Sequence, residues 1–482
     1  MLDQGTRAKH RADNREVQPV GAAAMSGMAS AGPSAPSTTM RTPHASGESS
    51  PLGRHKFFRA LLMLSVAALP WNAVQPGGVP IGDVFLAAAV FTGTPLLMRG
   101  FSRMPAPLWL GSLLVFLSGA ICAVFPPGEH YLTSRFQLSQ QLLVTLGVTP
   151  RSTANLSSMF KYELGLFVLP LVVLAAAGGP AAQPYRRKLV AAWSAGIFLS
   201  QALAYSDRLG LTSVGYSLLG YNDVSGRQAG LSNQPNTLAL QSAMCLPIVL
   251  YWLAGSRASR IRGLILFLGC AAGLYVSESR GAFVGAFVAL ALVPVVWPRA
   301  RAWTGRLLLL FGVAGFYVLL TSGGSKVLAA FRLSGSDTDG TASSDYERAA
   351  ARAQGFADFR HALVQGIGWG HAGDAHLLYV QLLAAGGVIG AIGVLGYLGG
   401  FVVAGWTGCR KRSALAATMI ASILTWLVLG LVENQLTDQW IYVPICVLAA
   451  EIAADRGRDK TASAHPAGQL PAVRVGDVGR EE

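Results

Sequence analysis

Three short polar segments combine arginine, histidine or amide side chains with glycine. Arg280 lies in the run SESRGAF, Arg227 and Asn236 begin and end the run RQAGLSNQPN, and His376 closes the run GIGWGHAGDAH. A guanidinium group makes charge-assisted, two-pronged hydrogen bonds to phosphate oxygens, and an amide both donates and accepts. A neutral imidazole can take a proton from a hydroxyl group. These residue types would suit the binding of phosphate or sugar oxygens, with a base at hand.

Each segment also has an ordinary structural interpretation. Arg280 could pair with Glu278 or simply reach toward water, and the run that holds Arg227 could be a plain loop. A metal site built from the histidines at 361, 371 and 376 is the weakest reading, because spacings of ten and five residues match no common zinc motif. We therefore expect no metal and no cofactor.

The composition indicates what kind of elements hold these segments. Of 482 residues, 52% are hydrophobic and only 13% are charged, against about a quarter charged in soluble domains. The net charge of +14 does not indicate a nucleic-acid partner, because the basic residues lie in short gaps between apolar runs. Those runs match the length that a helix needs to cross about 30 Å of hydrocarbon. The sequence predicts an all-α polytopic integral membrane protein.

Twelve apolar runs are candidate transmembrane helices. They cover residues 57–74, 81–98, 107–125, 162–178, 189–205, 236–254, 263–278, 281–297, 307–322, 377–404, 413–432 and 439–454. The transmembrane domain then spans 57–454, and the polar ends 1–56 and 455–482 are predicted to be disordered.

Charge in the short gaps predicts the orientation of the chain. If the first residue lies inside, the internal gaps hold fourteen Lys and Arg and no acid, whereas the short external gaps hold Arg280 as their single basic residue. Because basic loops stay in the cytoplasm, both termini are expected there. Three longer segments, 126–161, 206–235 and 323–376, then lie on the periplasmic side, with the largest loop between the ninth and tenth spans. Within that loop, the Ser344 and Glu347 spacing predicts a helix over 345–364.

The chain must reverse direction close to Arg280. The two runs around it extend over 35 residues, which would measure about 52 Å as one helix. This length far exceeds the hydrocarbon thickness, so two helices joined by almost no loop are expected, with Arg280 at the outer membrane boundary.

Taken together, three segments resemble the O-antigen ligase and polymerase superfamily of bacterial envelope glycosyltransferases. The similar stretches are GRQAGLSNQPNTLA at 226–239, SESRGAFVGAF at 277–287, and a longer one from Arg352 to Gly390 that contains GFADFRHALVQGIGWG and AHLLYVQLLAAGGVIG. The order and spacing of the motifs carry the resemblance over about residues 200–405. Two positions differ from the family pattern, since Leu377 follows the histidine where Asn is usual and Phe356 stands in place of Trp.

The resemblance implies an enzyme of the inner membrane. Its donor would be a glycan on a polyprenyl diphosphate, and its acceptor a sugar hydroxyl of lipid A core or of a growing glycan. Arg227 and Arg280 would hold the diphosphate, with Arg352 and Asn236 as further contacts to phosphate or glycan. His376 would orient or deprotonate the acceptor at the periplasmic face, without metal or nucleotide.

Two alternatives remain. A polymerase of O-antigen or exopolysaccharide would share the donor and differ only in the acceptor. A polyprenyl-glycan flippase or another transporter would need ionisable residues along a path through the membrane. The predicted spans carry almost no charge at mid-depth, and the candidate residues gather at one face, which favours an enzyme.

Overall fold

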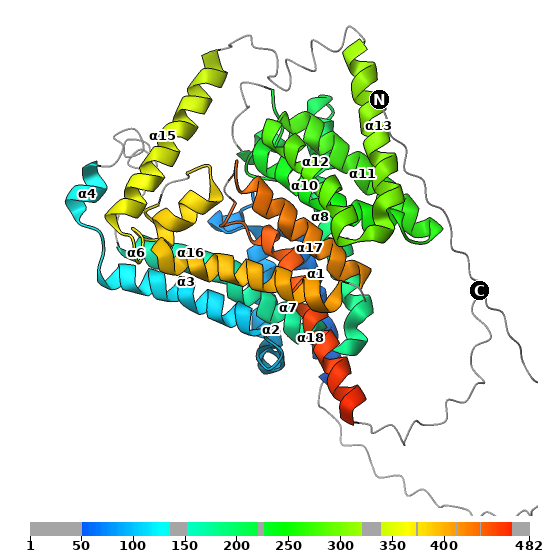
Figure 1. The fold of residues 1–482 in the computed structure, drawn as a ribbon, viewed down its shortest axis with the longest axis horizontal. Helices are drawn as coiled ribbons and strands as arrows, with labels where there is room; N and C mark the ends of the chain where they lie inside the picture. The colour runs from blue at the N-terminus through cyan, green and yellow to red at the C-terminus, as the bar shows by residue number, and fades with distance from the viewer. Residues whose placement is uncertain are drawn as a thin grey trace, which may run out of the picture. The chain divides into compact units, whose positions relative to one another are not determined.

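The structure is a computed structural model that describes residues 51–134, 152–219, 226–320, 339–372, 375–410, 413–433 and 435–464. All the regular secondary structure in these ranges is helical (Figure 1). The apolar composition explains this result, because a segment inside a bilayer must satisfy its own backbone N–H and C=O groups.

A helix covers most of each predicted span. In chain order these helices are α1 (Pro51–Ala68), α2 (Ile81–Phe101), α3 (Ala106–Val124), α7 (Leu169–Ala177), α8 (Gln183–Arg208), α10 (Pro235–Leu253), α11 (Arg257–Ser277), α12 (Arg280–Val296), α13 (Arg301–Leu320), α16 (Leu378–Ala404), α17 (Ala414–Leu429) and α18 (Val443–Ala464). Connecting segments hold α4 (Glu129–Ser134), α6 (Ser152–Glu163), α9 (Val214–Leu219) and α15 (Asp339–His361). A π-helical turn, Leu164–Val168, joins α6 to α7.

Seven helical segments of the described ranges are long and apolar enough to cross a membrane. They are Ile81–Phe101, Ala106–Val124, Ser158–Ala177, Pro180–Arg208, Pro235–Leu253, Arg257–Ser277 and Leu378–Gly408, and the shorter α12 and α17 are also apolar. The protein is a helical membrane protein, which confirms the coarse part of the predicted fold class. The count of twelve spans and the side on which each loop lies stay predictions.

Three predicted boundaries need correction. Helix α1 begins at Pro51, inside the segment 1–56 that was predicted to be disordered, because proline is well suited to the first position of a helix. Helix α18 runs on to Ala464, ten residues beyond the predicted limit at 454. The predicted ends followed the loss of hydropathy, but helical backbone bonds do not require apolar side chains. Residues 1–50 and 465–482 lie outside the described residues.

The third boundary is the start of α15, which is Asp339 rather than residue 345. Ser344 therefore lies inside the helix and not at its N-cap. A capping-box spacing is a local signal, and here the helix continues through it.

Helices α3 and α16 pack closely, side by side (Figure 1). A Cβ atom on Gly111 would lie 2.7 Å from the carbonyl oxygen of Gly393, and one on Gly393 would lie 2.9 Å from that of Gly111. Small residues thus bring the two backbones together, as is common between membrane helices. In addition, Trp369, in the segment between α15 and α16, donates its indole N–H to the hydroxyl of Ser118 on α3 at 3.1 Å.

Helix α16 is broken at Gly387, whose φ of 59° and ψ of −158° suit glycine alone. The segment that follows α15 satisfies the backbone groups freed by the break. Four hydrogen bonds of 2.9 to 3.1 Å do this, from Ile367 to Ala384, from Gly368 to Ala385, from Val388 to Leu363 and from Ile389 to Val364. Irregular backbone within an apolar helix is tolerated here because the break is buried in protein. The break fixes the end of α15 against α16.

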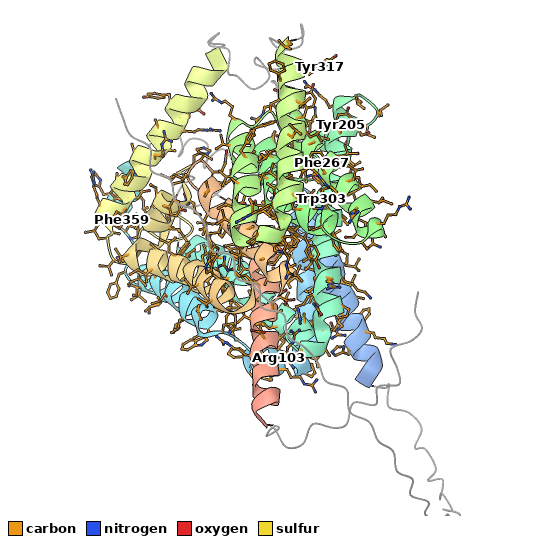
Figure 2. The ribbon with its side chains drawn as sticks, turned by 45° about the vertical axis from the view of Figure 1, so that its right-hand side comes forward. Arg103, Tyr205, Phe267, Trp303, Tyr317 and Phe359 are labelled. Atoms are coloured by element: carbon orange, nitrogen blue, oxygen red, sulfur yellow. The ribbon has the colours of Figure 1, made fainter. Side chains whose placement is uncertain are left out.

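Helix α8 connects the two ends of the bundle. Its 26 residues measure about 39 Å. Its first turn lies near the ends of α2 and α7, whereas Arg208 in its last turn contacts the end of α11. Figure 2 labels Arg103, close to the first turn of α8, and Tyr205, in its last turns, toward opposite ends of the bundle.

Candidate functional site

The chain reverses where the sequence predicted, between α11 and α12. Helix α11 ends at Ser277 and α12 begins at Arg280, so only two residues separate them. Glu278 takes the left-handed conformation, with φ of 48°, that closes this turn. Arg280 is consequently the first residue of α12 and is partly buried.

The 226–236 segment is tied to this turn by directed hydrogen bonds. Arg227 donates from Nε to the carbonyl of Ser277 at 2.7 Å and from Nη2 to Oδ1 of Asn236 at 2.6 Å. The backbone N–H of Gln228 donates to the carbonyl of Val276 at 3.0 Å. These bonds hold the Arg227 guanidinium in one orientation at the beginning of α10, so the segment is more than a plain loop.

A cavity of about 390 Å³ lies at this end of the bundle. Its lining brings together three residues that the sequence singled out, Arg227, Asn236 and Arg280. We call it the Arg227–Arg280 cavity. Its volume is in the range of small-molecule sites. Its other charged lining residues are Glu278, from the same turn as Arg280, and Arg348 and Glu433, from two further parts of the chain.

The carboxylates of the cavity are engaged with arginines. Oε1 of Glu278 lies 3.2 Å from Nη2 of Arg208, and Oε1 of Glu433 lies 3.8 Å from Nη2 of Arg348. The sequence suggested that Glu278 could pair with Arg280. The structure shows a pair with Arg208, a residue that the sequence analysis did not single out. Arg208 also donates to the carbonyl of Gly226 at 2.5 Å. Arg208 follows the end of a predicted span on the same predicted side as Arg280, and this position could have identified it as a candidate.

His376 lies just before α16 and is not among the residues that line the cavity. Its φ of 47° is left-handed, which is uncommon for a residue with a side chain. The backbone N–H of Leu378 donates to the carbonyl of Gly430 at 2.7 Å. This bond attaches the start of α16 to the segment after α17, whose Glu433 lines the cavity. His376 is thus linked to the cavity wall through neighbouring backbone.

Gln381 stabilises the segment on which His376 lies. Its Oε1 accepts from the backbone N–H of Ala375 at 2.8 Å, and its Nε2 donates to the carbonyl of Ala372 at 3.3 Å. The first turn of α16 therefore holds its own preceding loop, which fixes the backbone of His376.

On α15, the arginine that lines the cavity is Arg348, one turn before the predicted Arg352. Arg352 is exposed and is not among the lining residues. Tyr131 holds the far end of α15, because its ring stacks on His361 at 3.6 Å between centroids and its hydroxyl donates to Asp358 at 2.8 Å.

Among the residues that the structure describes, no three His, Cys, Asp or Glu side chains form a group that could hold a metal ion. Chemically, the arrangement offers three guanidinium groups, of which Arg227 is held by directed hydrogen bonds, together with one amide and two paired carboxylates around a small cavity. Such a set suits an anionic group with several oxygens. No protein-family model matches the chain, and no curated protein sequence matches it either.

Proposed function

We propose that the protein is an inner-membrane glycosyltransferase that moves a glycan from a polyprenyl diphosphate onto an acceptor sugar hydroxyl, as O-antigen ligases do. One observation carries the proposal: Arg227 and Asn236 of the 226–236 segment and Arg280 of the α11–α12 turn line one cavity at the ends of α10, α11 and α12. The resemblance of the three motifs supplies the substrate class.

The donor diphosphate would bind between the guanidinium groups of Arg227 and Arg280. In the transfer, the bond between the anomeric carbon and the diphosphate oxygen breaks, and a bond from the acceptor oxygen to that carbon forms. Negative charge grows on the departing diphosphate, where preoriented guanidinium groups stabilise it. The bonds from Arg227 to Ser277 and Asn236 support such preorientation.

His376 would accept the proton that leaves the acceptor hydroxyl. Its loop is attached to the cavity wall through the Leu378–Gly430 bond, which supports a position beside the donor. Arg348 would take the accessory role first expected of Arg352, because it lines the cavity and pairs with Glu433.

The proposed topology has twelve spans with both termini in the cytoplasm. The basic internal gaps support it through the positive-inside rule. The cavity then opens on the periplasmic side, where lipid-linked glycans are used.

The direct experiment reconstitutes the purified protein with a polyprenyl-diphosphate-linked glycan and lipid A core, and measures the joined product. We expect Arg280→Ala and His376→Ala to lower transfer by about 10²-fold or more. Arg262→Ala, an exposed arginine outside the cavity, is the matched control and should retain transfer. Full transfer by either site variant, at equal abundance in the membrane, would remove the proposed role of that residue.

Deleting the gene separates a ligase from a polymerase. Loss of a ligase leaves long chains on the carrier lipid and none on lipid A. Loss of a polymerase leaves single repeat units attached to lipid A, and that pattern would replace the ligase proposal. Loss of glycan export, with the purified protein inactive in transfer, would indicate a transporter.

A further inference from the structure

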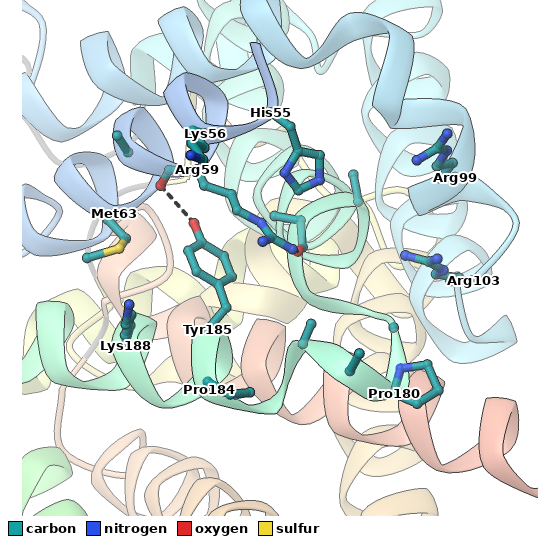
Figure 3. Close-up of a pocket in the computed structure, with 16 residues that line it drawn as sticks. His55, Lys56, Arg59, Met63, Arg99, Arg103, Pro180, Pro184, Tyr185 and Lys188 are labelled. Carbon is teal, nitrogen blue, oxygen red and sulfur yellow. Dashed lines mark hydrogen bonds between the residues drawn. The ribbon is translucent and has the colours of Figure 1, made fainter. Parts of the chain in front are cut away.

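A second cavity, of about 670 Å³, lies at the other end of α8 (Figure 3). The first turns of α1 and α8 and the ends of α2 and α7 surround it. We call it the basic cavity, because its charged lining residues are Lys56, Arg59, Arg99, Arg103 and Lys188, and His55 lies among them. None of the described residues that line it is Asp or Glu.

The nearby acid does not neutralise this cluster. Glu451 on α18 pairs with Arg186 on α8, with Oε1 and Nε 2.7 Å apart and both side chains buried. Arg186 is not among the residues that line the cavity, and it also donates to the carbonyls of Ala177 and Gly179. The basic cavity therefore keeps a concentration of positive charge that an anionic ligand would relieve.

Arg59 is held in place for such a ligand. Its Nη2 donates to the carbonyl of Ala176 at 2.9 Å, and its guanidinium lies 4.8 Å from the ring centroid of Tyr185. Its Nε is buried, and no described residue accepts a hydrogen bond from it. In Figure 3, Arg59 and Arg103 extend into the cavity from opposite sides. A buried donor without an acceptor is uncommon.

The rest of the lining is mostly apolar. Small side chains such as Ala60, Ala175 and Ala182 form much of the wall. On α2, Phe91 is 84% and Met98 is 74% exposed, so the surface that leads to Arg99 suits contact with acyl chains. A ligand that fits has an anionic head at the helix ends and apolar chains along the helices.

We propose that the basic cavity binds the headgroup of an anionic phospholipid, with preference for a headgroup that carries two phosphates. Basic pockets between membrane helices bind such headgroups. Guanidinium and ammonium groups on opposite walls can bind two phosphates at once. A headgroup with one phosphate would contact only one wall and should bind more weakly.

Lipid binding can be measured by native mass spectrometry of the full protein in detergent micelles. The probes are cardiolipin, phosphatidylglycerol, phosphatidylcholine and inorganic diphosphate. We expect cardiolipin to bind most tightly and phosphatidylcholine least. Preferential binding of inorganic diphosphate would assign the cavity to a soluble anion and overturn the lipid proposal.

Two double variants locate the site. Lys56→Gln with Arg99→Gln removes two exposed cavity charges, and should weaken cardiolipin binding about 25-fold, from about fivefold per charge. Arg257→Gln with Arg262→Gln removes the same charge from exposed positions outside the cavity, and should change binding less than about twofold. Equal losses in both variants would mean nonspecific attraction and would contradict the proposed site.

Arg59→Gln supplies a third measurement that tests the buried donor. It should weaken cardiolipin binding at least as much as the loss of one exposed charge. If the variant does not fold, the exposed double variant still decides the proposal, since neither of its positions is buried.

Discussion

The Arg227–Arg280 cavity and the basic cavity both gather arginines at helix ends, but they hold the charge differently. In the first, Arg227 is oriented by two directed hydrogen bonds, and carboxylates lie in the same lining. In the second, the described charged residues are all basic, and Lys56, Arg99 and Lys188 are exposed. Oriented charge among competing acids suits a substrate that must arrive, react and leave. An uncompensated basic cluster suits an anion that stays bound.

Exchanging arginine for lysine should separate the two cavities most strongly. Arg227→Lys keeps the charge but cannot donate to both Ser277 and Asn236, so we expect transfer to fall about 10- to 100-fold. Arg99→Lys in the basic cavity should change cardiolipin binding less than about twofold, because charge alone matters there. Transfer assays measure the first effect and lipid titrations the second. If both cavities tolerated the exchange of arginine for lysine equally well, the proposed difference between them would be contradicted.

A substitution that displaces α15 should impair the Arg227–Arg280 cavity but not the basic cavity. A Cβ atom on Gly387 would lie 2.4 Å from the carbonyl oxygen of Val364, and its φ is left-handed, so Gly387→Ala should displace the segment that fixes α15. We expect transfer to fall about tenfold, because both Arg348 on α15 and the segment that leads from α15 to His376 would shift, with cardiolipin binding unchanged.

Gly396→Ala is the matched control on the same helix, because no atom lies within 4 Å of its added Cβ. It should keep both activities. Equal behaviour of the two variants would mean that the break in α16 does not position α15.

A smaller effect is expected from the pair at the edge of the Arg227–Arg280 cavity. Nη2 of Arg348 and Oε1 of Glu433 are 3.8 Å apart and the two side chains are partly exposed, so their attraction is weak. Arg348→Ala should raise the KM for the donor about threefold with little change in kcat. Steady-state kinetics would contradict this accessory role if kcat fell while KM stayed constant.

The smallest effect concerns pH at the basic cavity. Burial first, and then the charges of Arg59 and Arg99, lower the pKa of His55 below its ordinary value of 6.5. A lowered pKa in the folded state means that stability is present above pH 6.5 and is lost as the pH falls through the folded-state pKa. A bound anion offsets this loss, so cardiolipin affinity should be up to about twofold higher at pH 5.5 than at pH 7.5.

His55→Gln should abolish that difference. The other charged residues that face His55 come from α1, the end of α2 and α8, and are Lys56, Arg59, Arg99, Arg103 and Lys188. Lysine and arginine ordinarily titrate far above this pH window. A pH effect that persists in His55→Gln would assign it elsewhere.

The features that were predictable from the sequence are those that follow from helix length and the spacing of apolar runs. The reversal before Arg280 followed from hydrocarbon thickness, and its meeting with Arg227 followed from placing both at one end of the bundle. The register of α15 was not predictable, because the break at Gly387 depends on hydrogen bonds to a segment that lies 17 to 25 residues earlier in the sequence. The basic cavity was missed because its charges lie in the N-terminal segment, at the start of the first predicted span and in two separate gaps that look like ordinary cytoplasmic loops.

The most direct measurement is the affinity of the purified protein for polyprenyl diphosphate compared with polyprenyl monophosphate, in wild type, Arg280→Ala and Arg262→Ala. We predict that the wild type and Arg262→Ala prefer the diphosphate by about tenfold or more, and that Arg280→Ala loses this preference while it keeps its cardiolipin binding. Unchanged preference for the diphosphate in Arg280→Ala would contradict the assignment of the Arg227–Arg280 cavity as the donor site.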